Sequence, residues 1–505
     1  MKYGFLFGAG AEAGYGLPSG GKFALDIFRH DVSKSKKMFK EMRDNVEGTT
    51  RYASFWLPEG FKEKNISSFG KTVFQNIIKD TVEHNRDNII KRINNFDEVA
   101  RNEAKAMKSM GIDIEALLEK LLERELDNIH MGQTIAFIDE FKQGNDLFNS
   151  SYFSALLMVY RDKNIITGEQ RIEFGKILLA IIQLHVGALS ESLTRKINDG
   201  LFAKKDDEID IFDDIGEIIQ LNYSSSGLTG MEYLLDQRKA DVSTDAGKCL
   251  RFAQRMIEAL YAVVLDYKSL IDANWHYLYS PSSDWAKFCK ICIFLLNVRD
   301  YISEIAQAAN PEGKTGYYHM LKNAMEDNKF EVSAIATTNY NQFIKDILST
   351  EVAFLNGSTE IWYDPYLNRM GKKEELTTSE KHILVPLMFT QSGTKPMTSI
   401  EMSVKYVDTY KKWKESDKIV IVGFGFGVDD EHINGVLRTL IDVDDKKIVV
   451  VTLNKNKEDA EVAKEIGRTL KITKISNIFV VQVDKEGKRI TDNTLWTEAM
   501  LDNYR

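Results

Sequence analysis

Short runs of apolar and β-branched residues, each followed by a glycine-containing or polar turn and an amphipathic segment, occur at both ends of the chain. This alternation is typical of a parallel α/β sheet. The first run is too short to bury both of its faces alone, so we expect it to pair with strands more than 300 residues later in the chain. The predicted strands are residues 3–7, 332–336, 352–355, 383–388, 418–422, 447–453 and 478–483.

The middle of the chain has a helical pattern instead. Between Pro58 and Pro281 there is no proline, which permits long helices. In residues 111–126 the apolar positions recur every three or four residues, and residues 171–189 and 249–267 behave similarly. The fold class that we predict is therefore α/β, a Rossmann-like parallel sheet with a large all-helical insertion. The expected domains are 1–30 together with 331–505 for the sheet, and 31–330 for the insertion, which we expect to serve regulation or oligomerisation.

Composition narrows the class of protein. The chain has 505 residues, of which 43% are hydrophobic and 28% charged, as in a soluble protein with more than one core. A net charge of -9 argues against a large nucleic-acid surface. Three cysteines cannot staple a secreted fold, which favours a cytoplasmic protein. The longest apolar stretch, residues 177–189, is shorter than the ~20 residues that cross a bilayer, so we expect no membrane segment.

The first candidate site is the loop GAGAEAGYGLPSG, residues 8–20, directly after the first predicted strand. Glycines at such a position let backbone N–H groups approach a dinucleotide pyrophosphate, and the following helix favours negative charge. A glycine turn after a strand is often only a turn, and that interpretation stays open. The candidate binding residues in this loop are Gly8, Ala9, Gly10, Ala11, Gly16 and Pro18.

Four further motifs follow predicted strands in the last third of the chain. They are ATTNYNQF with Thr338 and Asn339, FLNGSTEIWY with Asn356, IVIVGFGFGVDDEHIN with Gly423, Phe424, Gly425 and His432, and IVVVTLNKN with Asn454. Plainer interpretations exist for three of these residues. Asn339 suits a helix cap near Tyr340, Asn454 a strand-end turn, and His432 a solvated or ion-paired side chain.

Together the five motifs, in this order, resemble those of the SIR2-like (sirtuin-fold) family. GAG followed by small residues and G-[IL]-P is similar to the sirtuin loop, and the TTN and GFGF..HIN stretches resemble those of prokaryotic SIR2-like antiviral-defence proteins. The resemblance implies that the first loop and Thr338, Gly423, Phe424, Gly425 and Asn454 bind NAD. It also implies that Asn339 contacts the nicotinamide ribose and the attacking water.

Three departures from the family pattern limit the chemistry. Asn356 stands where the family has a histidine, and a neutral amide cannot take a proton at physiological pH, so deacylase chemistry is not expected. Asn341 stands where the defence proteins have Asp. The zinc ribbon of sirtuin deacylases is missing, since only Cys289 and Cys292 are close together, and these are expected on a buried helical face rather than at a metal site.

From this resemblance we expect an NAD glycohydrolase that releases nicotinamide and ADP-ribose, with Asn339 and Asn356 as catalytic residues and no metal. The implied biological role is antiviral defence by abortive infection. An unrestrained enzyme of this kind would kill its host, so we expect an oligomer neighbour, a partner protein or a ligand to gate the site.

Two other function classes remain open. One is a sensor or scaffold subunit of a defence complex that binds NAD or ADP-ribose without cleaving it, because Asn356 replaces the base; His432 is the candidate substitute for that base. The other is a dehydrogenase, since GAGAEA fits GxGxxA. A dehydrogenase requires an acidic residue at the end of the next strand, about 20 residues on. Asp26 and Asp31 are near that distance, but residues 20–28 have a helical pattern.

Overall fold

The chain forms two compact units. The computed structural model describes residues 1–17, 21–68, 86–130, 147–189, 228–236, 239–262, 271, 274–309, 315–388, 395–427 and 430–502. The first unit, called the sheet unit, comprises Met1–Ser19, His30–Phe69 and Lys268–Arg505, and the second, the helical unit, comprises Gly20–Arg29 and Gly70–Tyr267. These boundaries differ from the expected 1–30 with 331–505, because helices on either side of the insertion belong to the sheet unit.

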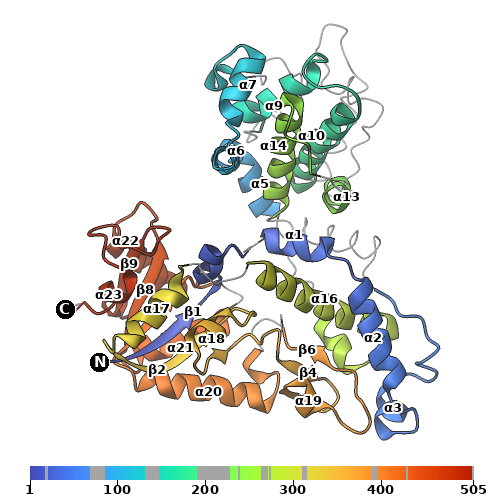
Figure 1. Ribbon diagram of the computed structural model, residues 1–505, viewed down its shortest axis with the longest axis vertical. Coiled ribbons are helices and arrows are strands. Elements are labelled where there is room, and N and C mark those ends of the chain that lie inside the picture. The colour runs from blue at the N-terminus through green and yellow to red at the C-terminus, as the bar shows by residue number, and fades with distance from the viewer. Residues whose placement is uncertain are drawn as a thin grey trace. The chain divides into compact units, whose positions relative to one another are not determined.

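A six-stranded parallel sheet forms the centre of the sheet unit (Figure 1). Its strands are β1 (Lys2–Phe7), β2 (Glu331–Thr337), β3 (Ala353–Phe354), β7 (Lys418–Val422), β8 (Lys447–Leu453) and β9 (Ile478–Val483), in the order β3-β2-β1-β7-β8-β9. Strand β1 therefore pairs with β2 on one side and with β7 on the other, as expected for the N-terminal run. Numbered within this sheet alone, the order is 3-2-1-4-5-6, that of the dinucleotide-binding doubly wound sheet.

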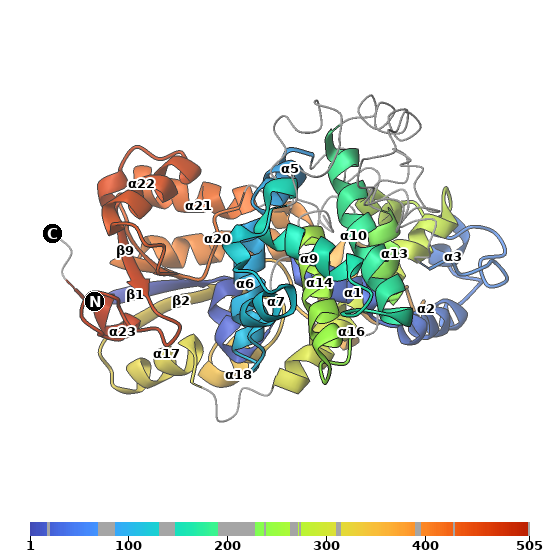
Figure 2. The ribbon, with the colours of Figure 1, turned by 90° about the horizontal axis from the view of Figure 1, so that it is seen from above.

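Helices cover both faces of this sheet. Figure 2 shows α17 (Tyr317–Glu326), α18 (Phe343–Leu348) and α23 (Trp496–Ala499) on one side of the strands, and α20 (Ile400–Lys414), α21 (Glu431–Asp442) and α22 (Asp459–Leu470) on the other. The side chains of β1 alternate accordingly. Tyr3, Phe5 and Phe7 join the core under α17. Gly4 faces α20, where a Cβ would lie 2.3 Å from the Trp413 ring.

One predicted strand of the sheet was wrong. Residues 383–388 contribute only β6 (Val385–Pro386), which belongs to a separate three-stranded sheet with β4 (Trp362–Asp364) and β5 (Arg369–Gly371). This sheet is antiparallel. Pro386 lacks the backbone N–H that a central strand needs. The apolar pattern of residues 383–388 indicates that they are buried, but it does not indicate which sheet they join.

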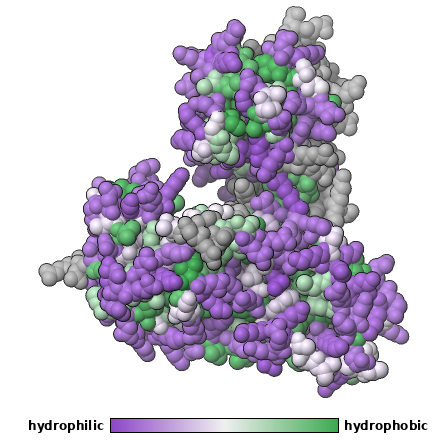
Figure 3. Space-filling model, viewed as in Figure 1, coloured by the Kyte–Doolittle hydropathy of each residue, from purple (hydrophilic) through white to green (hydrophobic). Residues whose placement is uncertain are grey.

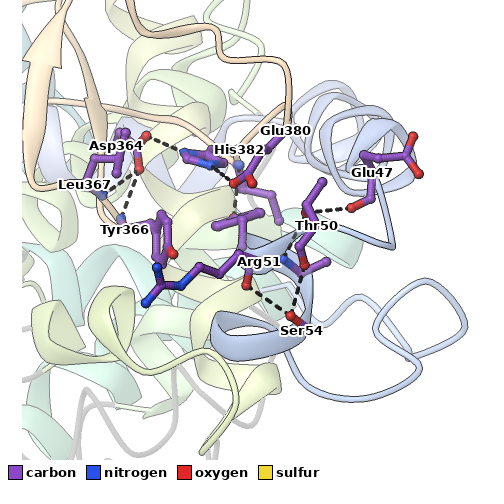
Figure 4. Close-up of polar contacts among 12 residues, drawn as sticks. Glu47, Thr50, Arg51, Ser54, Asp364, Tyr366, Leu367, Glu380 and His382 are labelled. Atoms are coloured by element: carbon purple, nitrogen blue, oxygen red, sulfur yellow. Dashed lines mark hydrogen bonds and ion pairs between the residues drawn. The ribbon is translucent and has the colours of Figure 1, made fainter.

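A buried charged cluster fastens this small sheet to the helix α3 (Arg51–Trp56) (Figure 4). His382 lies between two carboxylates, with Nδ1 2.7 Å from Asp364 Oδ2 and Nε2 3.0 Å from Glu380 Oε2. The Tyr52 ring of α3 lies 4.2 Å from the imidazole, and its hydroxyl accepts the Ile383 N–H at 3.1 Å. Burial lowers the pKa of His382, but the hydrogen bonds to the two carboxylates outweigh it and the pKa is raised.

The helical unit has its own core, as the sequence pattern predicts. Its described helices include α1 (Gly21–Arg29), α5 (Arg86–Asn94), α6 (Phe96–Lys108), α7 (Ile114–Leu122), α9 (Ser151–Arg161), α10 (Gly168–Leu189), α13 (Leu228–Asp236) and α14 (Asp245–Tyr261). Asp113 caps α7 by accepting the Ala116 N–H at 3.3 Å. The buried cluster drawn from these helices includes no residue of β1.

The remaining helices of the sheet unit include α2 (Ser33–Asn45), α16 (Trp285–Ala309) and α19 (Lys373–Leu376). Cys289 and Cys292 are buried free thiols on α16, which confirms their prediction as part of a buried helical face. No helix within the described ranges is long and apolar enough to cross a bilayer. Hydrophilic side chains cover most of the face seen in Figure 3.

Candidate functional site

The two glycine loops, which follow β1 and β7, meet where the order of the strands in the sheet reverses. After β1 the chain continues to β2 on one side, and after β7 it continues to β8 on the other, so the loops that follow β1 and β7 diverge. Ligands of such sheets bind outside the carboxyl ends of the strands at this switch point. Gly8 N–H donates to Val422 O at 2.9 Å, and Gly10 N–H donates to Gly423 O at 2.9 Å. The structure thus brings together the first and fourth motifs.

The two loops can approach this closely only because these positions are glycines. A Cβ at Gly8 would lie 2.6 Å from Gly423 O, and one at Gly10 would lie 2.9 Å from Gly423 Cα. Gly423 has φ +64°, and a Cβ there would lie 2.2 Å from the Ala11 nitrogen. Substitution at Gly423 would therefore combine a left-handed backbone with a backbone clash.

After β1 the chain forms a 3-10 helix, η1 (Ala9–Tyr15), whose two faces differ. Ala11, Glu12 and Tyr15 are buried. The exposed positions are the small residues Ala9, Gly10, Ala13, Gly14 and Gly16, and a Cβ at Gly14 or Gly16 would meet nothing within 4 Å. At these five exposed positions the side chain is a methyl group or a hydrogen atom. Pro18, another candidate, lies outside the described residues.

Hydrogen bonds from the following helix, α21, hold the loop after β7 in its conformation. Phe426 has φ +54°, and Asn434 of α21 donates its amide hydrogens to the carbonyls of Phe426 at 3.3 Å and Gly427 at 3.0 Å. The ring of Phe424 packs on that of Phe426 with centroids 5.2 Å apart. Gly425 between them is exposed, and a Cβ there would meet nothing within 4 Å. The loop is held in shape while its Gly425 backbone stays open.

Thr338 and Asn339 follow β2, next to the first loop. The Thr338 N–H donates to Phe7 O at 3.0 Å. Asn339 is buried, and its Nδ2 donates to Gly8 O at 3.1 Å and to the Tyr318 hydroxyl at 3.0 Å. The alternative that Asn339 caps a helix was wrong, because α18 begins at Phe343 and the Phe343 N–H is accepted by Asn341 Oδ1 at 3.0 Å.

The buried face of η1 carries an acidic residue, Glu12, that the sequence analysis missed. Glu12 is 5% exposed; one of its carboxyl oxygens accepts the Tyr318 hydroxyl at 2.8 Å and the other accepts Asn341 Nδ2 at 2.6 Å. Burial raises the pKa of Glu12 to about 7, against the lowering effect of hydrogen bonds from Tyr318, Asn341 and Asn339. The signal that was available is one acidic residue in a run of alanines and glycines.

Asn356 follows β3, at the carboxyl edge of the same sheet. The Leu355 N–H donates to Thr337 O at 2.9 Å, so this loop continues the pairing with β2. Gly357 has φ +84°, and a Cβ there would lie 1.8 Å from Leu387 O. The Asn356 side chain is 6% exposed, and its Oδ1 has no hydrogen-bond partner among the described residues. A buried acceptor of this kind calls for an explanation, and a bound ligand or water supplies one.

His432, in the first turn of α21, is neither solvated nor ion-paired as the plainer interpretation held. Neither ring nitrogen has a hydrogen-bond partner within the part of the chain that the structure describes. Its ring lies 5.8 Å from that of Tyr406, whose hydroxyl donates to Leu355 O at 2.8 Å. Burial and the nearby Lys395 lower the pKa of His432 to about 3, so the imidazole is neutral at physiological pH.

Asn454 follows β8 at the same edge. It is exposed, and its Oδ1 accepts the Asn456 N–H at 2.8 Å. The backbone N–H of Asn454 donates to Val483 O at 3.0 Å. This side-chain oxygen thus serves the strand-end turn, which was the alternative interpretation of this residue.

No family model matches the sequence, and the comparisons found no match among curated proteins or solved structures. The resemblance to SIR2-like proteins therefore rests on the motifs alone. Within the described ranges, no group of three or more His, Cys, Asp or Glu side chains is arranged to hold a metal ion.

Proposed function

We propose that this chain binds NAD at the carboxyl edge of its sheet, where β1 and β7 separate, and hydrolyses the bond between nicotinamide and ribose. The observation that carries the proposal is the meeting of the two glycine loops at the switch point, with the asparagines that follow β2 and β3 at the same edge. Glycine-lined backbone at this position suits a dinucleotide diphosphate.

Each part of the site has a role in this proposal. The exposed backbone of η1 around Gly14 and the exposed Gly425 receive the diphosphate. Asn339 and Asn356 accept hydrogen bonds through their amide oxygens and orient a water molecule on C1′ of the nicotinamide ribose. The water oxygen forms the new bond to C1′, the C1′–N bond breaks with its electron pair going to nicotinamide, and the water proton passes to solvent.

This reaction suits a site without a strong base. Nicotinamide leaves as a neutral molecule from a cationic ring, through an oxocarbenium-like state, so orientation and electrostatics supply much of the rate. Deacylation in sirtuins also needs a base to activate the ribose hydroxyl, and Asn356 cannot act as one. The proposed cellular role, loss of NAD in an infected cell under control of a partner or ligand, comes from the resemblance to SIR2-like defence proteins.

The experiment follows nicotinamide release from NAD by the full-length protein, with and without candidate activators. In Asn339→Ala we expect release to fall on the order of 100-fold, as for loss of one preorganised polar contact. Asn323→Ala, an exposed asparagine on α17, is the control and should release nicotinamide at the wild-type rate. Equal rates in wild type and Asn339→Ala would contradict the proposal.

A second candidate function is binding of NAD or ADP-ribose without cleavage. Asn356 favours it, because neither this amide nor the neutral His432 is a strong proton acceptor. Isothermal titration with NAD separates the two: binding without nicotinamide release under every condition supports the sensor.

A further inference from the structure

A chain of hydrogen bonds connects the carboxyl group of Glu12 to the side chain of Asn339. Asn339 Nδ2 donates to the Tyr318 hydroxyl at 3.0 Å, and that hydroxyl donates to Glu12 Oε1 at 2.8 Å. Glu12 Oε2 accepts Asn341 Nδ2 at 2.6 Å. All four side chains are buried. The first glycine loop and the loop after β2 are thus joined by polar contacts that water does not reach.

The direction of these bonds fixes the Asn339 amide. Its nitrogen donates both hydrogens inward, to Tyr318 and to Gly8 O, so its oxygen is turned to the other side. Tyr318 has one proton and can give it to Glu12 only while Oε1 is free to accept. Oε2 must also accept, because Asn341 donates to it. Because a donor faces each oxygen, these contacts fit the ionised form of Glu12.

We propose that Glu12 acts through Tyr318 as a positioning residue for Asn339, so that the site holds the amide in its working orientation on NAD when Glu12 is ionised. This inference rests on the proposed function, because it concerns the same site. A proton on Oε1 makes this oxygen a donor toward the Tyr318 hydroxyl, so the hydroxyl proton must turn toward the Asn339 amide and one anchor of Asn339 is weakened.

The titration of Glu12 falls in the range where this matters, since burial raises its pKa to about 7. The pKa values of its titratable neighbours are shifted away from that range. Burial raises the pKa of Tyr318 and of Tyr15, and burial lowers the pKa of His319, which bonds to the Tyr15 hydroxyl. Lys345 and Asp346 of α18 are exposed, and among the described residues no ion pair joins Glu12.

The contact with Asn341 offers a matched pair of variants. In Glu12→Gln the new amide can accept from Tyr318 only if its nitrogen faces Asn341 Nδ2, which places two donors together. Asn341 cannot turn over without losing the Phe343 N–H that its Oδ1 accepts at 3.0 Å. Adding Asn341→Asp to Glu12→Gln exchanges amide and carboxylate across the same contact and restores a donor facing an acceptor.

The experiment measures NAD affinity and nicotinamide release between about pH 5.5 and about pH 8.5, a range that brackets the titration of the group. In wild type both should rise as the pH passes about 7. Glu12→Gln and Tyr318→Phe should lose this rise and be weaker by roughly tenfold, the size of one charge-assisted hydrogen bond. The double variant should recover most of that loss. Glu461→Gln, an exposed residue of α22, is the control and should match wild type.

An unchanged pH rise in Glu12→Gln, or a double variant as impaired as the single one, overturns the inference and leaves the proposed function standing. If Glu12→Gln does not fold, Tyr318→Phe carries the same test, and a wild-type pH profile in that variant overturns the inference. Wild-type protein that neither binds NAD nor releases nicotinamide overturns the proposed function, and the inference with it.

Discussion

At the scale of single residues, the side chain of Asn356 is central to the proposed reaction. The Asn356 oxygen is buried without a partner among the described residues, at the position where the resembling family has a histidine. A histidine at this position would place a proton acceptor at the same carboxyl edge of the parallel sheet.

Asn356→His is therefore expected to raise the rate of nicotinamide release, because an imidazole supplies the base that the amide cannot. General-base catalysis contributes roughly 10²-fold or more where the geometry permits it. The measurement is nicotinamide release at saturating NAD. A rate below that of wild type would contradict this prediction and show that an imidazole cannot replace the water-orienting contact of the amide.

His382 is expected to make the sheet unit less stable at alkaline pH. Its pKa is raised above 6.5 in the folded protein by Asp364 and Glu380, so the cluster's contribution is complete below about pH 6.5 and is lost as pH rises through the folded pKa. In His382→Gln the unfolding free energy should fall by roughly 3–5 kcal/mol at about pH 6, because Asp364 is left buried without its cation.

Urea unfolding at about pH 6 and about pH 8.5 checks this difference, since the first lies below the ordinary imidazole pKa and the second lies about two units above it. The gap between wild type and His382→Gln should narrow at the higher pH. A gap that stays constant would mean that the imidazole packs without carrying charge.

At the scale of elements, the contact between η1 and the loop after β7 depends on one backbone conformation. Gly423→Ala should destabilise the sheet unit by at least about 2 kcal/mol, since a left-handed non-glycine residue is strained and its Cβ would meet the Ala11 nitrogen. NAD binding should fall with it. Gly425→Ala, in the same loop but facing open space, should change stability by less than about 0.5 kcal/mol. Equal losses in the two variants, measured by urea unfolding, would contradict this account.

The sequence predicts elements better than the contacts between them. Six of the predicted strands lie in the parallel sheet, because alternation with amphipathic segments is a local signal. Residues 383–388 were assigned to the wrong sheet because an apolar run alone does not indicate which strands it pairs with. The glycines of the first loop were correctly located at a strand end, but their contact with Gly423 could not be foreseen, since it joins residues more than 400 positions apart. Glu12 was missed for the same reason, because its partners lie in α17 and after β2.

At the scale of the whole molecule, the two units have separate hydrophobic cores. A chain that lacks residues 1–7 loses β1 and with it both of its parallel ladders. We expect such a chain to lose the unfolding transition of the sheet unit and to keep that of the helical unit, whose core includes no residue of β1.

Calorimetry and far-UV circular dichroism of the truncated chain check this prediction. Phe55→Ala, which removes a side chain that is 77% exposed, is the control and should keep both transitions. A truncated chain with both transitions intact would contradict the central role of β1.

The position of β1 also sets when the proposed NAD site can form during synthesis. Lys2 and Asp417, which hydrogen-bond across β1 and the start of β7, are 415 residues apart in the chain. At ordinary rates of translation, roughly 20 to 80 s pass between their emergence from the ribosome. A nascent chain therefore spends most of its synthesis with Tyr3, Phe5 and Phe7 unpaired and the proposed NAD site unformed. Products of interrupted translation that end before β7 would lack the proposed site.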